Sequence, residues 1–273
     1  MRRSVWSTLS FEHTGITTFA RRIKKQNTST LNIINYLKGV HYSYVEEDLR
    51  NKSDLLLRCN PVHQSVPVLI HDGRPVCESQ VILQYIDEVF VAGSSGGATS
   101  SAFSLLPADP HERAVARFWA AYVDDEIGAP WEKAFRSRTE EERAAWMGKV
   151  AAAVPGLERG LRECTDGGRK GCFFGGAGGV GYVDVVLGGV APYVHAMEKV
   201  SGLRLFDGER TPLLAAWLER FGELEVARAV LPDVDRVVGY VRMIHAKNAA
   251  MIPGRDREPA WHGDAWPASR RLA

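Results

Sequence analysis

The segment Val66–Ser79, VPVLIHDGRPVCES, contains two short runs of strand-forming residues separated by Asp72-Gly73. This dipeptide readily adopts the positive φ angles of a tight turn, so the segment predicts a β-hairpin. Pro67 has no N–H to donate, which suits the first residue of a strand or a sheet edge. Residues 79–90 follow with apolar side chains at helical spacing and predict an amphipathic helix.

Upstream of the hairpin, short helical and extended patterns alternate. Residues 31–40 carry leucine and isoleucine about one turn apart and predict the end of a helix that stops at Gly39. Residues 41–49 begin with the alternation of a half-buried strand, and residues 51–61 predict a loop or a short helical turn. Together with the hairpin, these segments indicate a small α/β domain over residues 31–91.

Downstream, residues 92–108 are rich in Gly, Ser and Ala and predict a linker. Helical spacing then continues through residues 109–247, which predict an all-helical second domain. Capping residues and first-turn prolines mark helix starts at Asp109-Pro110, Thr139, Gly181–Asp184, Thr211-Pro212 and Asp233. Residues 248–273 have no periodicity and predict a mobile tail, while residues 1–30 form an atypical basic leader.

Composition and charge exclude several classes of partner. The chain of 273 residues has a formal net charge of +1, so no global field attracts nucleic acid or an acidic membrane. Its four cysteines form no CxxC pair and its eight histidines show no ligand spacing, so no metal is expected. No apolar run reaches the roughly 20 residues that cross a bilayer. These properties predict a soluble protein of the cytoplasm.

The leader provides an alternative compartment. Residues 1–30 contain six basic residues, ten Ser or Thr and a single acid, Glu12, which is a composition typical of transit peptides. Import into a plastid or a mitochondrion is therefore the alternative to the cytoplasm. An irregular basic leader without a role in import has the same composition.

Binding chemistry is indicated at the end of the hairpin. If the Val66-Pro67 bond is cis, the Val66 N–H and C=O face outward and can pair with an extended peptide. Glu78-Ser79 stands at a helix start, where free N–H groups and the helix dipole favour a carboxylate, and Glu78 can accept an ammonium group. Taken singly, the same residues also fit structural roles, with Ser79 as an N-cap, Glu78 as a first-turn acid and Pro67 as a strand-edge residue.

Several segments resemble the plant tau-class glutathione transferases over about residues 31–246. They are LKGVHYSYVEEDLRNKSDLLLRCNPVHQSVPVLIHDGRPVCESQVILQYIDEV, LLPADPHERAVARFWAAYVDDEI, GYVDVVL and TPLLAAWLERF. The resemblance implies an α/β plus all-α fold, in which a thioredoxin-like domain precedes an all-helical domain. It also implies a homodimer that conjugates the thiol of glutathione, as co-substrate without a cofactor, to hydrophobic electrophiles.

The same resemblance assigns the binding residues. It implies that Glu78 and Ser79 bind the γ-glutamyl end of glutathione, that Val66 beside a cis Pro67 pairs with the cysteinyl backbone, and that Lys52 reaches the glycyl carboxylate. The family usually has a second lysine where this chain has Ser65. Losing one charge-assisted hydrogen bond costs at most about 1.5–3 kcal/mol, so we expect weaker glutathione binding.

The catalytic residue of the family has no counterpart at its usual place. Members carry a serine after the first strand that donates a hydrogen bond to the glutathione sulfur. Counting back without a gap from LKGV, residues 37–40, puts Lys25 at the position of that serine. Residues 1–30 lack a convincing first strand, and Thr28 or Ser29 read best as N-caps. Because a free thiol has a pKa near 8.5, a protein without this donor leaves glutathione mostly protonated at neutral pH. The catalytic residue is therefore left unassigned.

Other patterns support weaker interpretations. GAGGVG, residues 176–181, matches a dinucleotide-binding motif, but no strand precedes it, so a loop before a capped helix is expected. Six aromatic residues at helical positions are interpreted mainly as core: Trp119, Trp131, Phe135, Tyr193, Trp217 and Tyr240. The alternatives to an enzyme are a carrier of small hydrophobic ligands with the same fold and, third, a chain that does not fold stably.

Overall fold

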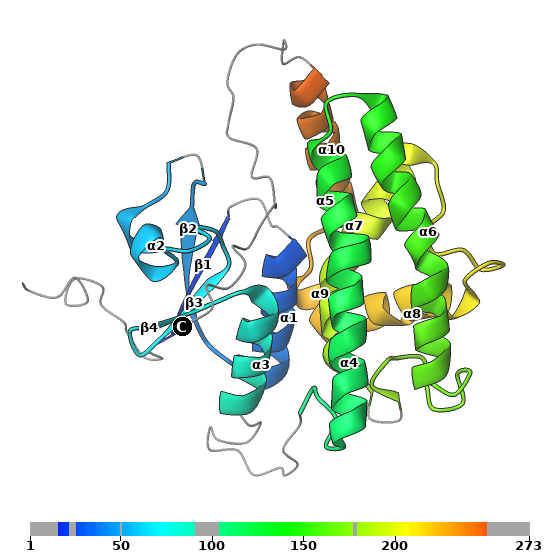
Figure 1. Ribbon diagram of the computed structural model, residues 1–273, viewed down its shortest axis with the longest axis horizontal. Coiled ribbons are helices and arrows are strands. Elements are labelled where there is room, and N and C mark those ends of the chain that lie inside the picture. The colour runs from blue at the N-terminus through cyan, green and yellow to red at the C-terminus, as the bar shows by residue number, and fades with distance from the viewer. Residues whose placement is uncertain (1–15, 22–25, 50, 91–103, 177–178, 250–273) are drawn as a thin grey trace, which may run out of the picture.

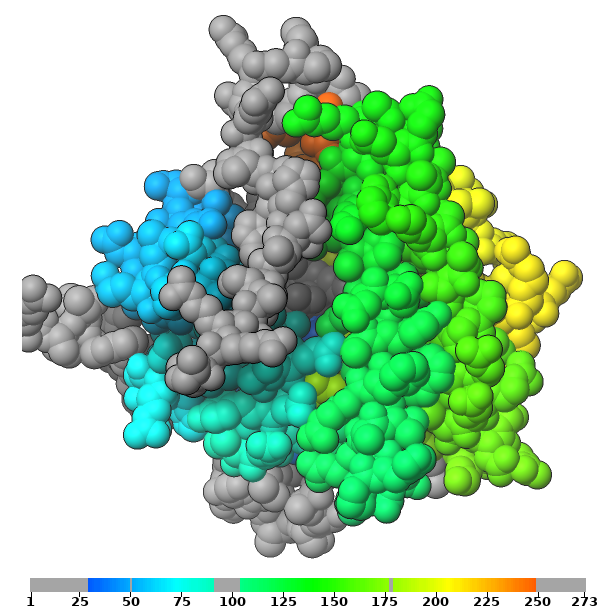
Figure 2. Space-filling view, viewed as in Figure 1, coloured from blue at the N-terminus to red at the C-terminus, as the bar shows by residue number. Residues whose placement is uncertain are grey.

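The structure is a computed structural model that describes residues 16–21, 26–49, 51–90, 104–176 and 179–249. A sheet with its helices forms one side of the molecule, and a set of long helices forms the other (Figure 1). On the face shown in Figure 2, the N-terminal domain, in blue to cyan, lies beside the green helices of the C-terminal domain. The predicted order of an α/β domain followed by an all-helical domain is confirmed.

The N-terminal domain has a four-stranded mixed sheet. Its elements are β1 (Ile16–Arg21), α1 (Gln26–Lys38), β2 (Ser43–Glu47), α2 (Asp54–Cys59), β3 (Val68–His71), β4 (Arg74–Cys77) and α3 (Ser79–Val89). The strand order is β2-β1-β3-β4, in which β1 is parallel to β2 and antiparallel to β3. Helices α1 and α3 lie between the sheet and the long helices, while α2 covers the opposite face (Figure 1).

The expectation that residues 1–30 lack a first strand is wrong. Ile16–Arg21 forms β1, which pairs on both sides and is a central strand of the sheet. Its sequence, ITTFAR, contains three β-branched residues and a phenylalanine, the types that favour a strand. The strand was missed because basic residues adjoin it and the segment is short. In so short a segment, pairing with neighbouring strands decides the conformation more than the local sequence does.

The hairpin predicted around Asp72-Gly73 is confirmed. Asp72 and Gly73 have φ angles of 49° and 77°, which are the left-handed values that a tight turn between twisted strands requires. Helix α3 follows directly and buries Ile82, Leu83 and Ile86, as the apolar spacing predicted. Helix α1 ends before Gly39, whose φ of 64° suits the left-handed residue that commonly ends a helix.

The C-terminal domain consists of helices within the described residues. They are α4 (Pro110–Tyr122), a π-helical segment (Val123–Gly128), α5 (Ala129–Arg136), α6 (Glu140–Cys164), α7 (Tyr182–Ser201), α8 (Pro212–Glu223), α9 (Glu225–Val230) and α10 (Val234–Ala249). The capping residues predicted for α4, α6 and α10 accept first-turn N–H groups: Asp109, Thr139 and Asp233. Sequence reasoning missed α5, the π-helical segment and α9. None of the described helices has the length and apolarity to span a membrane.

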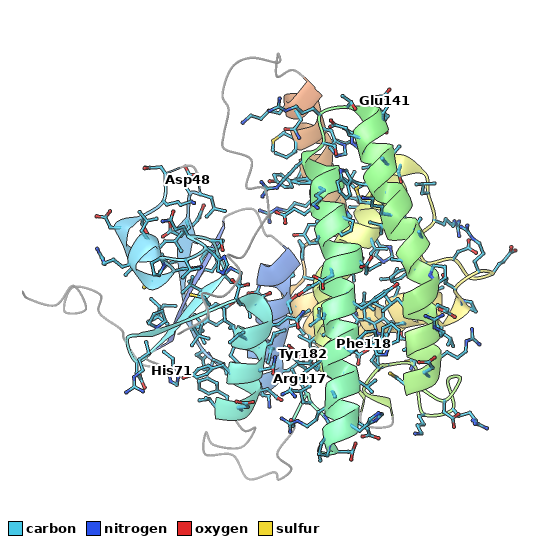
Figure 3. The ribbon with its side chains drawn as sticks, viewed as in Figure 1. Asp48, His71, Arg117, Phe118, Glu141 and Tyr182 are labelled. Atoms are coloured by element: carbon cyan, nitrogen blue, oxygen red, sulfur yellow. The ribbon has the colours of Figure 1, made fainter. Side chains whose placement is uncertain are left out.

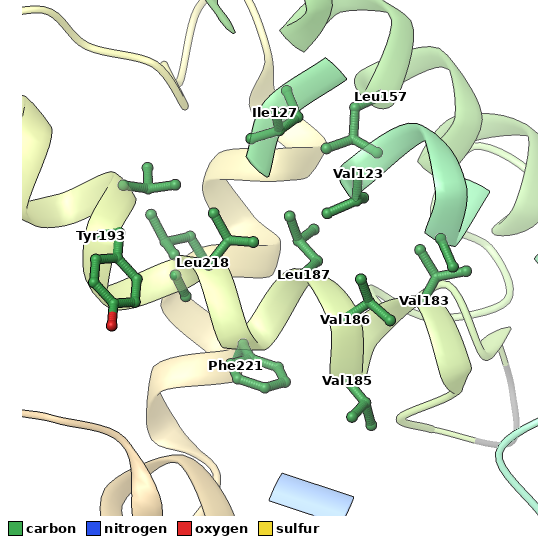
Figure 4. Packing of buried hydrophobic residues seen from close by; sticks show 14 of the residues in the cluster. Val123, Ile127, Leu157, Val183, Val185, Val186, Leu187, Tyr193, Leu218 and Phe221 are labelled. Carbon is green, nitrogen blue, oxygen red and sulfur yellow. The ribbon is translucent and has the colours of Figure 1, made fainter. Parts of the chain in front are cut away.

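The hydrophobic core joins the two domains. Its main cluster contains apolar residues of α1 and α3 together with those of the C-terminal helices. Helix α7 is buried over most of its length, and Figure 4 shows its valines and Leu187 packed against neighbouring helices. A smaller cluster lies between α2 and the sheet and contains Val68 and Ile70 of β3 together with Leu56 of α2. Leu69 belongs to the main cluster, so successive residues of β3 serve opposite faces of the sheet.

A buried ion pair fixes the exit from the N-terminal domain. Lys38 Nζ at the end of α1 lies 2.7 Å from Asp87 Oδ1 in α3, and both side chains are almost fully buried. Asp87 also accepts hydrogen bonds from the Leu105 and Leu106 N–H groups and from the Ser104 hydroxyl. The chain entering the helical domain is thereby held against α3. Most of the predicted linker and the predicted tail lie outside the described residues.

Candidate glutathione site

The hairpin brings two of the predicted binding segments together. β3 and β4 are antiparallel with Val68 opposite Cys77, so Val66-Pro67 before β3 and Glu78-Ser79 after β4 lie at the same edge of the sheet. β1 pairs with β3 in antiparallel register, so its carboxyl end also lies at this edge. The sheet topology thus collects segments that are far apart in the sequence.

Strand β2 adds the segment that carries Lys52. β2 is parallel to β1, so the chain after Glu47 leaves the sheet at the same edge. The buried Glu47 carboxylate accepts hydrogen bonds from the Ser53 N–H and hydroxyl, which holds the loop between β2 and α2. Lys52 lies in this loop and is half-buried. All of the predicted binding residues therefore come from loops at a single edge.

The backbone of Val66 has the conformation that the sequence predicted. The Val66-Pro67 bond is cis, and no hydrogen bond to the Val66 N–H or C=O is found within the described part of the chain. Asn60 fixes the preceding loop, because its side chain donates to the Ser65 C=O at 2.9 Å and accepts from the His63 N–H at 3.1 Å. Sequence reasoning missed Asn60. The peptide of Val66 is thus held in place and left open to a ligand.

Glu78 has an unusual backbone conformation at the start of α3. Its φ is 71°, a value rare for a residue other than glycine, which costs of order 1–3 kcal/mol and persists only where its surroundings impose it. Its C=O accepts the first hydrogen bond of α3, from the Ile82 N–H, so Glu78 and not Ser79 is the N-cap. The interpretation of Ser79 as an N-cap is therefore wrong.

The Glu78 carboxylate is open to a ligand. It makes no capping hydrogen bond, and its side chain is 59% exposed. His63 Nε2 lies 3.6 Å from one of its oxygens, a neighbour that the sequence did not indicate. Ser79 begins the helix, where first-turn N–H groups and the dipole favour an anion. An acceptor for an ammonium group and a donor site for a carboxylate therefore stand on consecutive residues.

Polar contacts with the C-terminal domain hold this end of α3. Gln80 Nε2 donates to Asp124 Oδ2 at 2.6 Å, and the Tyr182 hydroxyl donates to the Gln80 C=O at 3.2 Å. Burial raises the pKa of Asp124, against the opposing effect of the Gln80 hydrogen bond, and burial raises the pKa of Tyr182 to about 12. Figure 3 shows Tyr182 and Arg117 where α3 meets α4. Asp124, which sequence reasoning missed, thus helps to position the residues next to Ser79.

The thiol-activating group is not identified among the described residues. Lys25, at the position of the family's serine, lies outside the described residues. Helix α1 begins at Gln26, so Thr28 and Ser29 lie within its first turns and their interpretation as N-caps is wrong. Ser29 is fully buried and faces Tyr193 of α7, so it belongs to the contact between the domains. The catalytic residue stays unassigned.

The aromatic residues are mainly core, as expected. Trp119, Trp131, Tyr193 and Trp217 are each less than about a tenth exposed. Phe135 and Tyr240 are half-buried, with ring centroids 5.4 Å apart.

The described end of the GAGGVG motif, residues 179–181, also behaves as predicted and has neither helix nor strand. It precedes helix α7, and the Asp184 carboxylate accepts the Gly181 N–H. The motif therefore serves a helix start.

Comparisons with known proteins agree with this geometry. Residues 18–88 match the family model described as the glutathione S-transferase N-terminal domain. A probable glutathione S-transferase of rice, GSTU6, is 54% identical over 202 residues, which cover 74% of this chain and 82% of that protein. Glutathione transferase GST 23 of maize is 44% identical over 202 residues, 74% of this chain and 83% of that protein.

Solved structures agree as well. The mango tau-class glutathione S-transferase superposes with a TM-score of 0.71 at 33% identity, covering 84% of this chain and 98% of that one. Rice GST1, solved in complex with glutathione, gives a TM-score of 0.71 at 35% identity, covering 86% of this chain and 98% of that one. The chain belongs to the glutathione S-transferase family and, within it, to the plant tau class.

Proposed function

We propose that this transferase conjugates the thiol of glutathione to hydrophobic electrophiles, with Lys52, Ser65, Val66, Pro67, Glu78 and Ser79 forming the glutathione site. The observation that carries the proposal is the meeting of the Val66 peptide and Glu78-Ser79 at one edge of the sheet. Family membership makes glutathione the co-substrate. We propose in addition that this conjugation serves detoxification and stress response.

Each part of the tripeptide has a partner of matching chemistry. The γ-glutamyl carboxylate lies against the Ser79 hydroxyl and the first turn of α3, and its ammonium pairs with Glu78. The cysteinyl backbone forms two hydrogen bonds with the Val66 peptide in the manner of an added strand. Lys52 pairs with the glycyl carboxylate. This arrangement fixes the thiol relative to the protein and so supplies proximity and orientation.

The reaction is a nucleophilic substitution or addition. With a chloronitrobenzene acceptor, the thiol loses its proton to solvent, its sulfur lone pair forms the new S–C bond, and the C–Cl bond breaks to release chloride. The protein favours the reaction by holding the thiolate near the acceptor. Lowering the pKa of a thiol by two units requires about 2.7 kcal/mol of stabilisation of the thiolate. A site without an activating donor does not supply this stabilisation, so the thiol ionises, and conjugation is fastest, at alkaline pH.

Two measurements on one preparation test the function. Conjugation of a chloronitrobenzene acceptor is followed at several pH values, and retention on glutathione resin is measured beside it. Retention with turnover supports the transferase, and retention without turnover supports the carrier of hydrophobic ligands. Failure of both measurements contradicts the proposed site.

Glu78→Ala is expected to abolish retention on glutathione resin. The change removes the only carboxylate that we assign to the ammonium group of glutathione, while the exposed side chain adds little to the fold. Glu88→Ala removes an exposed acid from the same helix and is expected to leave retention unchanged. Equal retention of the Glu78 variant and the wild-type protein would refute the assignment.

Ser65→Lys is expected to lower the KM for glutathione by up to about tenfold. The added ammonium stands beside Val66 and gives the glycyl carboxylate a second charged partner, which is worth about 1.4 kcal/mol for each tenfold change. Steady-state kinetics at fixed acceptor concentration measure the change. Val62→Lys adds the same charge to an exposed position of the loop, and an equal effect there would indicate general attraction only.

A homodimer and a cytoplasmic location complete the proposal. Val81 on α3 and Phe118 on α4 are 51% and 60% exposed, and such apolar side chains are suited to contact with a second copy of the chain. The four cysteines are free thiols, which fits a reducing compartment such as the cytoplasm.

A further inference from the structure

Two of the four free cysteines, Cys59 and Cys77, lie next to each other between α2 and the sheet. The Cys77 thiol donates a hydrogen bond to the Cys59 C=O, and its sulfur lies 3.4 Å from that oxygen. Both cysteines flank segments of the glutathione site, but the proposed conjugation uses neither thiol. The pair is therefore available for other chemistry.

The register of the hairpin directs the Cys77 side chain toward α2. Cys77 of β4 is paired with Val68 of β3, so the two side chains lie on the same face of the sheet. Val68 is fully buried in the smaller apolar cluster beneath α2, and Cys77 packs against that cluster. Cys59, the last residue of α2, is a buried member of it. Both thiols thus belong to one cluster on one face.

The surroundings of the pair decide which oxidant can reach it. Cys59 is only 5% exposed, so the half-buried Cys77 is the thiol that a small solute meets first. Burial raises the pKa of both thiols, with Glu78 and Cys59 adding to the effect at Cys77 and Arg58 opposing it at Cys59. Thiolates are therefore scarce at neutral pH, and oxidation is expected to be faster at alkaline pH. Hydrogen peroxide is small and uncharged, so it suits this half-buried apolar site.

We propose that Cys59 and Cys77 form an oxidisable dithiol, which hydrogen peroxide converts to an intramolecular disulfide. The Cys77 thiolate attacks one peroxide oxygen, so that an S–O bond forms, the O–O bond breaks and hydroxide leaves to become water. The Cys59 thiolate then attacks the sulfur of this sulfenic acid, the S–S bond forms and the S–O bond breaks. A second hydroxide leaves and takes a proton. The two thiols lose two electrons, and the peroxide is reduced to two molecules of water.

The disulfide is expected to weaken glutathione binding, a consequence that rests on the proposed function. Cys59 precedes Asn60, whose side chain holds the loop before Val66, and Cys77 precedes Glu78. A disulfide places its sulfurs about 2.05 Å apart, so the Cys77 sulfur must leave the Cys59 C=O and the two segments must shift. Because small displacements at a preorganised site are costly, we expect the dissociation constant for glutathione to rise by about tenfold or more.

The test treats the full chain carrying Cys164→Ala and Cys172→Ala with hydrogen peroxide, since these changes leave only the proposed pair of thiols. Loss of both titratable thiols and a mass decrease of about 2 Da within a single chain are expected, both reversed by dithiothreitol. In the wild-type protein, cleavage before aspartate residues separates the two cysteines, because Asp72 lies between them. The peroxide-treated wild-type protein is expected to yield the two peptides joined by a disulfide.

Single variants test the order of the two steps. Cys77→Ala is expected to leave Cys59 as a reduced thiol, and Cys59→Ala is expected to stop at a sulfenic acid on Cys77 that dimedone traps. Absence of the joined peptides from the wild-type protein, or a disulfide between two chains in their place, would overturn the proposal.

Isothermal titration calorimetry with glutathione, before and after oxidation, tests the effect on binding. A mapped disulfide with an unchanged dissociation constant would overturn the expected link to the glutathione site. Failure of the reduced protein to bind glutathione would count against the proposed function alone, since the peptide map still reports on the thiol pair.

Discussion

Asp87→Ala is expected to lower the free energy of unfolding by about 3–5 kcal/mol, because it removes the buried carboxylate that lies 2.7 Å from the Lys38 ammonium. The same change removes the acceptor of the Leu105 and Leu106 N–H groups, which hold the entry to the helical domain against α3. The loss therefore combines a broken buried ion pair with unpaired backbone donors. Urea unfolding followed by tryptophan fluorescence measures it.

The neighbouring acid provides the control for this prediction. Glu88→Ala removes an exposed carboxylate from the next position of α3 and is expected to change the free energy of unfolding by less than about 0.5 kcal/mol. Lys38→Met combined with Asp87→Leu is expected to recover part of the loss, since an apolar pair has no charge to desolvate. A similar effect of the two single alanine variants would show that the buried pair has no special role.

Asp184→Ala is expected to destabilise the helical domain by about 4 kcal/mol or more, since each buried donor left unpaired costs about 1–3 kcal/mol. The fully buried carboxylate accepts the N–H groups of Phe174, Gly175 and Gly181 and the indole N–H of Trp217, all at 2.8–2.9 Å. It thereby joins the loop before α7 to α8. Denaturant unfolding measures the loss, and Glu219→Ala, an exposed acid on α8, is the control.

The cost of Asp184→Ala is also expected to depend on pH. Burial raises the pKa of Asp184 to about 6 in the folded protein, above its ordinary value of 3.8 and against the effect of its four hydrogen bonds. Between these values the folded state binds more protons, so the stabilisation by Asp184 is complete at low pH and falls as pH rises to 6. The difference in free energy of unfolding between the wild-type protein and the variant should narrow by roughly 2 kcal/mol from pH 4 to pH 6. An equal stability difference between the wild-type protein and Asp184→Ala at both pH values would contradict the raised pKa of Asp184.

Local signals predicted most of the elements. Asp72-Gly73 predicted the hairpin because few dipeptides tolerate two positive φ angles. Asp109-Pro110 predicted a helix start because Asp is favoured as an N-cap and Pro as the first helical residue. Helix α9 and the π-helical segment were missed because they are six residues long and have no capping side chain. In such short segments, packing against neighbours decides the conformation.

The first strand was missed for a related reason. ITTFAR is short and adjoins basic residues, and its place between β2 and β3 is what makes it a strand. Counting back from LKGV nevertheless put the position of the family's catalytic serine, Lys25, in the segment between β1 and α1. The residues that pair with β1 in the sheet lie about 26 to 55 positions further along the chain, which no local pattern reports.

For the site, the sequence alone predicted the binding chemistry of individual residues, but it did not predict how these residues are brought together. The types and order of Val66-Pro67 and Glu78-Ser79 were enough to indicate a ligand with an amino acid group and a peptide backbone, because proline and helix starts have local, context-free properties. The fold alone supplied the contacts of Gln80 with Asp124 and of Glu78 with His63, and the conformation of Glu78. Each of these depends on distances between segments separated in the chain, and those distances are set by packing of the two domains around α7.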